Sequence, residues 1–282
     1  MQTMNGNGTL PPAIEVRGVS KSFRPEGERR GMQKRALDQV DLLMRAGELV
    51  AVVGLNGSGK STLLRVLATL TTPDEGTVRV FGHDAVRESG RVRRLINRVS
   101  VEASFFKEMS AWENLSYAAR LYGRRGADVR DTVLTVLRRL GLARDALSRP
   151  MKQLSRGQQQ KVAIARSVLT TPNLLLLDEP TTGLDPRSKR EVQAFIAELH
   201  SGGGVTVLLS THDLVEAEAL CGRIVVIDRG RIAADASPAE LRGSGNGHAV
   251  PTLEDAFLRM TGRSFEQEAE EAGEAAGEGG GE

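Results

Sequence analysis

The chain has 282 residues, of which 40% are hydrophobic and 26% charged, a balance typical of a globular protein that buries a full core. No apolar run approaches the roughly 18 residues of a membrane span, and the polar N-terminus resembles neither a signal peptide nor an anchor. Cys221 is the single cysteine, which excludes an internal disulfide. We expect it to be a small buried residue in a reducing compartment.

The net charge of +2 is unevenly distributed along the chain. Residues 264–282 hold seven glutamates and no basic residue, so residues 1–263 carry a net charge of +9. A basic body is compatible with anionic nucleotides, anionic lipid surfaces or nucleic acid, and charge alone does not choose among them. The acidic tail is predicted to be disordered because it has few apolar residues to bury.

The first third of the chain predicts short strands joined by turns. Residues 24–35 are charged and contain glycine, so they predict a solvated loop, and residues 73–76 carry a turn signal. The predicted strands are residues 14–19, 39–43, 49–53, 77–81 and 96–101.

A glycine-rich loop with the spacing GxxxxGKS lies between strand 49–53 and a predicted apolar helix at 62–70. Glycines let backbone N–H groups wrap around phosphate oxygens, and the next helix turns its positive end toward them. Lys60 would neutralise the outer phosphates, and Ser61 would offer a hydroxyl to Mg²⁺. An ordinary glycine turn is the alternative, and the flanking strand and helix argue against it. The candidate polyphosphate-binding residues are Gly54, Asn56, Gly57, Ser58, Gly59, Lys60, Ser61 and Thr62.

Residues 109–147 are rich in leucine, alanine and arginine at helical spacing, which predicts a helical insertion. Beyond it, helices and strands alternate again, so the predicted fold class is α/β with a largely parallel sheet. The apolar faces predicted for the insertion are Leu115, Ala118, Ala119 and Tyr122, and then Val133, Val136, Leu137 and Leu140. The later predicted helices are residues 158–169, 187–199, 214–221, 238–241 and 253–260, and the later strands are residues 173–177, 205–210 and 223–228.

Four of the predicted strands end in polar groups, and in open α/β sheets ligands bind where the strands end. Strand 49–53 leads into the glycine loop, strand 96–101 into Glu102, strand 173–177 into Asp178 and Glu179, and strand 205–210 into His212. Asp178 suits a Mg²⁺ ligand, and Glu179 could orient or deprotonate a water molecule. The alternative is that the two carboxylates cap the next turn. His212 could bind an outer phosphate oxygen, although a lone histidine is often structural.

Residues 154–158 precede a predicted helix and allow two interpretations. Ser155 and Gln158 have the spacing of a capping box, which could be their whole purpose. The same helix N-terminus, with the small Gly157, could also bind a phosphate. The residues alone leave these interpretations even.

Residues 14–235 resemble the nucleotide-binding domain of ATP-binding cassette (ABC) transporters, with the motifs in the family's order. These are Walker A at Gly54–Ser61, a signature loop at Leu154–Gln158, Walker B at Leu174–Asp178, the catalytic Glu179, a D-loop at Gly183–Asp185 and the switch His212. The resemblance implies ATP and Mg²⁺ as cofactors and ATP hydrolysis as the activity. It further implies a P-loop NTPase fold with a mostly parallel central sheet, an antiparallel β subdomain and an inserted helical subdomain.

The resemblance also assigns residues that spacing alone does not. It places Ser155, Arg156, Gly157, Gln158 and Asp185 at the nucleotide and Phe23 against adenine, although Phe23 could simply pack near a strand end. Two residues depart from the family pattern. Arg156 stands where the commonest signature has glycine, and Glu102 stands where a glutamine contacts Mg²⁺, so Ser61, Asp178 and Glu102 are the implied metal ligands. A carboxylate cannot donate a hydrogen bond when ionised, so we expect altered coupling at Glu102.

The family further implies partners. The signature loop of one chain closes on the Walker A of another, so we expect a homodimer or a paired ATPase subunit. A separate multi-span permease would hold the chain at the inner, cytoplasmic face of the cell membrane, with one permease helix in a groove of the helical insertion. The segment 253–258 resembles exporter ATPases of the drug-resistance (ABC-2) group.

Two other functions are compatible with parts of the sequence. A soluble ABC ATPase that acts on nucleic acid or translation could use the basic body, but this chain has one cassette, no sustained heptads and no cysteine cluster. No nucleic acid is therefore expected. A module that binds nucleotide without turnover is disfavoured by Glu179 and His212. The predicted division is a disordered N-terminus at 1–12, the ATPase domain at 13–242 with its helical subdomain and signature loop at about 103–155, a linker and short helix at 243–263, and a disordered acidic tail at 264–282.

Overall fold

The computed structural model describes residues 11–24, 33–101, 104–124, 127–243 and 252–263. The strands in this part of the chain are β1 (Ile14–Phe23), β2 (Lys34–Met44), β3 (Leu49–Val53), β4 (Glu75–Val80), β5 (His83–Asp84), β6 (Ile96–Val99), β7 (Leu174–Asp178), β8 (Thr206–Thr211), β9 (Arg223–Asp228) and β10 (Arg231–Ala236). The helices are α1 (Lys60–Leu67), α2 (Ser89–Leu95), α3 (Ala111–Leu121), α4 (Ala127–Arg139), α5 (Arg156–Val168), α6 (Pro186–Gly203), α7 (Leu214–Leu220), α8 (Pro238–Gly243) and α9 (Leu253–Thr261), with 3₁₀ turns at Arg144–Ser148 and Met151–Gln153.

The strands form two sheets. The larger has the order β10-β9-β3-β8-β7-β6, and β9, β3, β8, β7 and β6 pair in parallel while β10 runs antiparallel to β9. The smaller sheet has the antiparallel order β2-β1-β4-β5. The predicted α/β fold, with a mostly parallel central sheet and an antiparallel β subdomain, is therefore confirmed.

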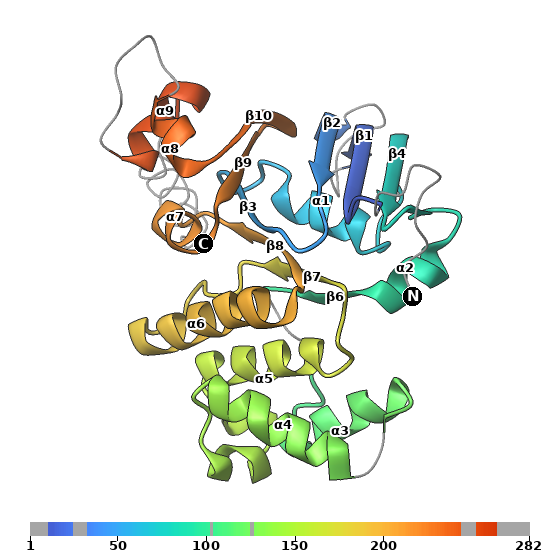
Figure 1. The fold of residues 1–282 in the computed structure, drawn as a ribbon, viewed down its shortest axis with the longest axis vertical. Helices are drawn as coiled ribbons and strands as arrows, with labels where there is room; N and C mark the ends of the chain where they lie inside the picture. The colour runs from blue at the N-terminus through green and yellow to red at the C-terminus, as the bar shows by residue number, and fades with distance from the viewer. Residues whose placement is uncertain (1–10, 25–32, 102–103, 125–126, 244–251, 264–282) are drawn as a thin grey trace, which may run out of the picture.

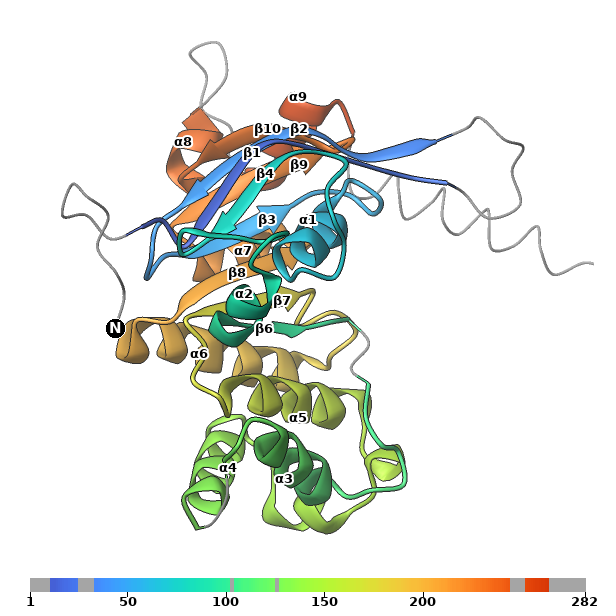
Figure 2. The ribbon, with the colours of Figure 1, turned by 90° about the vertical axis from the view of Figure 1, so that its right-hand side faces the viewer.

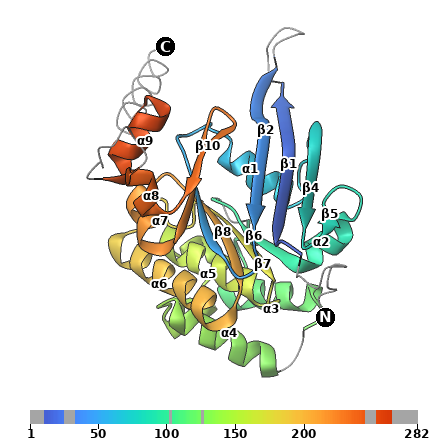
Figure 3. The same cartoon turned by 45° about the horizontal axis from the view of Figure 1, so that its top comes forward.

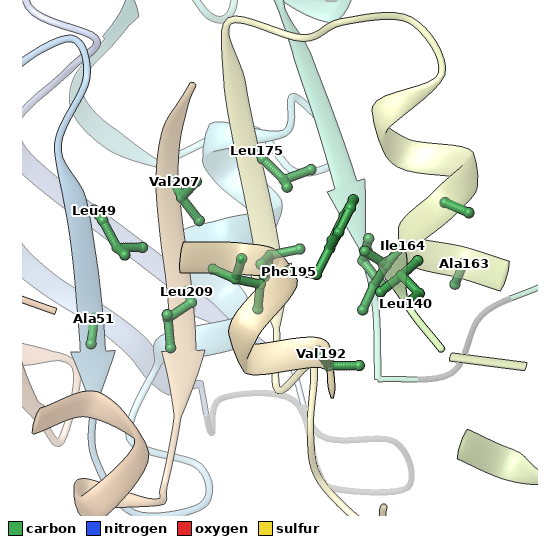
Figure 4. Close-up of a cluster of buried hydrophobic side chains, with 14 of the residues drawn as sticks. Leu49, Ala51, Leu140, Ala163, Ile164, Leu175, Val192, Phe195, Val207 and Leu209 are labelled. Atoms are coloured by element: carbon green, nitrogen blue, oxygen red, sulfur yellow. The ribbon is translucent and has the colours of Figure 1, made fainter. Parts of the chain in front are cut away.

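The central strands are apolar throughout because each face of their sheet is covered. Successive side chains on a strand point to opposite faces, so β3 sends Leu49, Ala51 and Val53 into one core and Val50 and Val52 into the other. Figure 4 shows part of the first core, where Leu175 of β7 and Leu209 of β8 lie beside Phe195 of α6. A strand buried on both faces has no polar alternation, which explains the run of leucines in β7.

The helices lie in layers on either side of the larger sheet (Figure 1). Helix α1 is packed between the two sheets (Figure 2), and α5, α6 and α7 cover the opposite face. Helices α3 and α4 lie beyond α5, at the end of the molecule away from the smaller sheet. Figure 3 shows α8 and α9 grouped near α7 and β10. Among the described residues, no helix is both long and apolar enough to cross a membrane.

Cys221 follows α7 and is buried, as the sequence predicted. Burial raises the pKa of its thiol to about 12, with a smaller contribution from the carboxylate of Glu216. The thiolate is the nucleophilic form of cysteine, so this side chain is held in its unreactive thiol form at neutral pH.

Several predicted elements differ from the structure. Strand β6 ends at Val99, two residues before the predicted end, and β2 begins at Lys34, inside the predicted loop at 24–35. Tyr122 was predicted to lie on a buried face of the insertion, but it follows the end of α3 and is exposed. Three elements, β5, α2 and β10, were not predicted, because they are short or expose charged residues. Glu102, residues 1–10, 25–32 and the tail 264–282 lie outside the described residues.

Candidate functional site

The glycine loop runs between β3 and α1 and is pressed against neighbouring backbone. Gly59 has φ 115°, which favours glycine, and a Cβ built there would lie 2.5 Å from the carbonyl oxygen of Ala36. A Cβ on Gly54 would lie 2.2 Å from the carbonyl oxygen of Ile227. Only glycine fits at these two positions, so the backbone of the loop can curl at the N-terminus of α1 and turn its N–H groups inward.

Lys60 extends along this loop. Its Nζ donates hydrogen bonds to the carbonyl oxygens of Gly54 and Leu55, at 2.6 and 2.9 Å, and lies 4.0 Å from Oε1 of Glu179. The side chain is only 4% exposed. The hydroxyl of Ser58 is also buried in the loop, without a hydrogen-bond partner among the described residues. A buried cation and a free buried donor inside a backbone cradle suit an anion with several oxygens.

Asp178 ends β7 beside this cradle and is 1% exposed. Its Oδ1 accepts hydrogen bonds from the hydroxyls of Ser61, at 3.0 Å, and Ser210, at 2.7 Å. Its Oδ2 lies 2.6 Å from Nη2 of Arg98 on β6. Neither Ser210 nor Arg98 is among the site residues predicted from the sequence. Strand β6 is the last strand of the larger sheet and contains Asn97 beside Arg98, so no apolar run made Arg98 stand out in the sequence.

Glu179 follows Asp178 in a left-handed conformation with φ 48°, which turns its side chain out of the strand. Its backbone N–H donates to the carbonyl oxygen of Ser210 at 3.0 Å. Its Oε2 accepts from the hydroxyl of Thr182 at 3.0 Å and lies 3.3 Å from Nδ1 of His212. The hydrogen bond from His212 is the main cause that lowers the pKa of Glu179, and the same bond raises the pKa of His212 above its ordinary value.

A buried carboxylate joins the segments that carry Glu179 and His212. Glu216 on α7 is 1% exposed and accepts hydrogen bonds from the hydroxyls of Thr181, at 2.7 Å, and Thr211, at 2.8 Å. Thr181 lies two residues after Glu179, and Thr211 directly precedes His212. Glu216 thereby fixes the two loops relative to each other. No local pattern marks Glu216, because one of its partners, Thr181, lies 35 residues away in the sequence.

The N-terminus of α5 carries a complete capping box. The side chain of Ser155 accepts from the N–H of Gln158 at 3.2 Å, and Oε1 of Gln158 accepts from the N–H of Ser155 at 3.0 Å. Ser155 and Arg156 are exposed, whereas Gly157 is buried against Ser188 at the start of α6. The capping interpretation is therefore confirmed, and the exposed groups remain available to a ligand.

The D-loop lies beside this cap. A Cβ on Gly183, which has φ 72°, would come within 2.9 Å of the Arg156 guanidinium. Asp185 is the N-cap of α6, and its carboxylate accepts hydrogen bonds from the N–H groups of Arg187 and Ser188, at 3.1 and 3.0 Å. The hydrogen bond from the Ser188 hydroxyl is the main cause that lowers the pKa of Asp185, and the hydrogen bond from the Ser188 N–H lowers it further.

The structure gives the positions of most of the remaining predicted site residues but does not assign them a role. Phe23 ends β1 and is 39% exposed, with the Lys21 ammonium 5.6 Å from the ring centroid. Asn56 and Gly57 are exposed on the glycine loop, and Thr62 is half-buried in the first turn of α1. Glu102 lies outside the described residues. The structure thus brings together the glycine loop, Asp178, Glu179 and His212 at one sheet edge.

The donors at this edge fit ATP and a magnesium ion. The glycine cradle, which a Cβ would fill, matches a triphosphate. The hydroxyl of Ser61 and the carboxylate of Asp178 are hard oxygen donors 3.0 Å apart. Mg²⁺ takes few protein ligands and completes its shell with phosphate and water oxygens.

A strand, a glycine loop and a helix beside a buried strand that ends in Asp and Glu define the class of P-loop ATPases. Within that class, the profile of the ABC transporter family matches residues 37–182. The chain therefore belongs to the ABC transporter family, as an ATP-binding subunit that hydrolyses ATP. The resemblance inferred from its motifs is confirmed.

Three similar proteins come from drug-resistance and import systems. The daunorubicin/doxorubicin resistance ATP-binding protein DrrA of Streptomyces peucetius is 43% identical over 232 residues, which are 82% of this chain and 67% of that protein. The daunorubicin resistance ATP-binding protein DrrA3 of Streptomyces coeruleorubidus is 40% identical over 251 residues, 89% of this chain and 75% of that protein. An import protein is also similar: the sulfate/thiosulfate import ATP-binding protein CysA of Rhodopseudomonas palustris is 37% identical over 234 residues, 81% and 64% of the two chains.

Solved structures agree with the fold. The dimeric ATP-binding cassette MJ0796, in a post-hydrolysis state bound to ADP and Pi, superposes with a TM-score of 0.72 at 29% identity, over 79% of this chain and 98% of that one. An ATP-binding subunit of an ABC transporter superposes with a TM-score of 0.76 at 29% identity, over 89% and 99% of the two chains.

Proposed function

We propose that this chain powers an export-type transporter, and that its own residues hydrolyse ATP with Mg²⁺ at the edge of the larger sheet. The convergence of Lys60, Ser61, Asp178, Glu179 and His212 on that edge is the observation that supports the proposal. The N–H groups of residues 54–61 hold the triphosphate, and the Lys60 ammonium moves from its two carbonyl partners to the outer phosphate oxygens.

The chemistry assigns distinct tasks to the residues at this edge. Ser61 and Asp178 would hold the metal ion, which would supply positive charge to the phosphate oxygens. Glu179 accepts a proton from a water molecule whose oxygen attacks the γ-phosphorus. The bond from that phosphorus to the bridging oxygen breaks, and ADP and inorganic phosphate leave. His212 orients Glu179 and hydrogen-bonds a γ-phosphate oxygen.

A second cassette completes this site. Ser155 and Arg156 are exposed at the N-terminus of α5, where backbone N–H groups and the helix dipole favour an anion. We propose that these groups bind the nucleotide held by another copy of the chain, or by a paired ATPase subunit, with Gln158 and Asp185 beside them. The dimers of the similar cassette MJ0796 support this arrangement. Phe23 is proposed to contact adenine, and Glu102 to contact the metal ion.

The groove between the sheet and the helical insertion is the proposed permease site. A pocket of about 430 Å³ lies between the end of β6 and helices α3 and α5. Ring contacts hold the side chains of its wall. Phe106 and Tyr117 pack edge to face with ring centroids 5.3 Å apart, and the Arg166 guanidinium lies 4.8 Å from the ring centroid of Phe105. Phe106, Tyr117 and Leu121 are nonetheless exposed. An apolar groove of this kind fits one helix of a partner.

The proposal also covers the direction of transport, the location of the chain and its division into domains. The drug-resistance proteins DrrA and DrrA3 are 43% and 40% identical to the chain, against 37% for the import protein, which supports export. Docking on a permease would place the chain at the cytoplasmic face of the membrane. We propose the ATPase domain at 13–242 with its helical subdomain at about 103–155, a linker and short helix at 243–263, and unstructured segments at 1–12 and 264–282. The relatives' names favour transport over the nucleic-acid alternative.

Two exposed leucines allow a matched test of the groove. Leu121 lines the groove and is 68% exposed, whereas Leu70 follows α1 away from it and is 59% exposed. The chain is co-expressed with a candidate polytopic permease, and its recovery with detergent-solubilised membranes is measured. Leu121→Ser is expected to lose membrane recovery while purified chain keeps its ATPase activity, and Leu70→Ser is expected to keep both. Equal membrane recovery of the two variants would contradict the groove as the docking site.

A further inference from the structure

A guanidinium that the proposed mechanism does not use lies beside Asp178, one of the two proposed Mg²⁺ ligands. Arg98 lies on β6, whose parallel pairing with β7 places Arg98 opposite Leu176, two residues before Asp178. Its Nη2 reaches Oδ2 of Asp178 at 2.6 Å, and its side chain is 19% exposed. The contact is a charge-assisted pair at close to optimal length.

The two oxygens of Asp178 face different partners. Oδ1 meets the hydroxyls of Ser61 and Ser210, and Oδ2 meets Arg98. The guanidinium therefore lies on the side of the carboxylate away from Ser61. It does not block the position between Ser61 and Oδ1, and it holds the carboxylate turned so that Oδ1 faces Ser61.

The position of Arg98 is enforced by the fold. Strand β6 pairs with β7 along its whole length, so the Arg98 backbone cannot move independently of the strand that carries Asp178. Its Nε is buried and lacks a hydrogen-bond partner among the described residues. A buried donor without a partner destabilises a protein, so its presence here indicates that the ion pair with Asp178 offsets that cost.

We propose that the Arg98 guanidinium is a built-in counter-cation for Asp178 at the magnesium site. It lets the chain bind ATP without the metal ion and makes the increase in ATP affinity on addition of Mg²⁺ smaller. Two carboxylates, Asp178 and Glu179, border the phosphate cradle and would repel a metal-free triphosphate. Arg98 offsets the charge of Asp178 from behind. A metal ion then meets a less negative site, so the same guanidinium lowers the site's affinity for Mg²⁺. The inference rests on the proposed Mg²⁺–ATP site and adds a positioning residue to it.

The test compares nucleotide binding with and without the metal ion. Binding of the fluorescent ATP analogue mant-ATP to the full chain is measured in EDTA and in a series of Mg²⁺ concentrations. In the wild-type chain, the affinity in EDTA is expected to lie within about tenfold of that in Mg²⁺. In Arg98→Gln the affinity in EDTA is expected to fall by about tenfold, and half-maximal tightening is expected at a lower Mg²⁺ concentration.

Two further variants control the test. Arg91→Gln also removes one positive charge, from a surface arginine of α2 that pairs with Glu88 at 2.7 Å, and it is expected to match the wild-type chain under both conditions. Arg98→Lys keeps the charge and is expected to keep most of the binding in EDTA. Equal binding of wild type and Arg98→Gln in EDTA would overturn the role of Arg98.

The measurement stays decisive if Arg98→Gln does not fold. Wild-type chain that binds mant-ATP in Mg²⁺ but shows no binding in EDTA would overturn the counter-cation role and leave the proposed nucleotide site intact. Wild-type chain that binds under neither condition would contradict both. Binding in EDTA that Arg91→Gln retains and Arg98→Lys largely retains supports the inference.

Discussion

The edge of the larger sheet and the N-terminus of α5 carry polar groups in opposite circumstances. At the sheet edge, Asp178 and Lys60 are almost fully buried and their partners come from the same chain. At α5, Ser155 and Arg156 are exposed, and the Ser155 side chain caps its own helix. The groups at the sheet edge are held in place by the hydrophobic cores on the two faces of the larger sheet, whereas the groups at α5 face outward. The catalytic groups can therefore be held in place within one chain, while the exposed groups at α5 are the ones proposed to act on a second molecule.

The largest effect is expected at the sheet edge. Glu179→Gln removes the proposed base and should slow phosphate release by roughly 100- to 10,000-fold, the usual contribution of general base catalysis. ATP binding should persist, and the ATP-bound chain should elute as a stable dimer in size-exclusion chromatography. Glu198→Gln, which removes a surface carboxylate 3.2 Å from Arg139, should leave turnover unchanged. Normal turnover of Glu179→Gln would remove Glu179 from its proposed role.

A loss of binding is expected when the cradle loses its cation. Lys60→Ala should weaken ATP affinity by roughly 10- to 100-fold, because a hydrogen bond to a charged group contributes about 1.5–3 kcal/mol. Isothermal titration with ATP and Mg²⁺ measures this change. Lys152→Ala removes a surface lysine that pairs with Glu108 at 2.6 Å and should bind ATP like the wild type. Unchanged affinity of Lys60→Ala would contradict the phosphate cradle.

Two substitutions at one residue separate capping from phosphate binding at α5. Asn and Asp are both good N-cap residues, whereas loss of a cap costs about 1 kcal/mol, so Ser155→Asn and Ser155→Asp should unfold at similar temperatures. Ser155→Asp adds a negative charge where a second chain's phosphates are expected. It should therefore reduce ATP-driven dimerisation and turnover more than Ser155→Asn. Equal activity of the two variants would mean that Ser155 only caps the helix.

The smallest effect concerns the pair of Glu179 and His212. Glu179 raises the pKa of His212 above 6.5, so protonated His212 is favoured by the folded chain. The contribution from the raised pKa of His212 is fully present below pH 6.5 and is lost as pH rises through the folded pKa of His212. At the acid side, the lowered pKa of Glu179 means that its contribution is present above 4.5 and is lost as pH falls through the folded value. NMR titration of the His212 ring should show a lower pKa in Glu179→Gln, and an unchanged pKa would contradict the pairing.

Local motifs predicted much of the site. The glycine loop, Asp178 and Glu179 are close in sequence to the strands that position them, so spacing alone placed them at one sheet edge. His212 followed because parallel strands end on the same edge. Arg98, Ser210 and Glu216 were missed because their roles depend on contacts between distant segments. Strand β10 was missed because its small and charged side chains carry a weak apolar signal.

Local patterns are enough to predict the class of fold, the phosphate loop and the order of the motifs, because glycine spacing and apolar runs involve residues that are close in sequence. The tertiary structure alone decided how Asp178 is turned, since a strand far away in the chain supplies Arg98 and another supplies Ser210. It also decided that Ser155 caps a helix while it stays exposed, and that the loops of Glu179 and His212 are joined by Glu216. Side-chain contacts across the sheet depend on register and strand order, which no local pattern specifies.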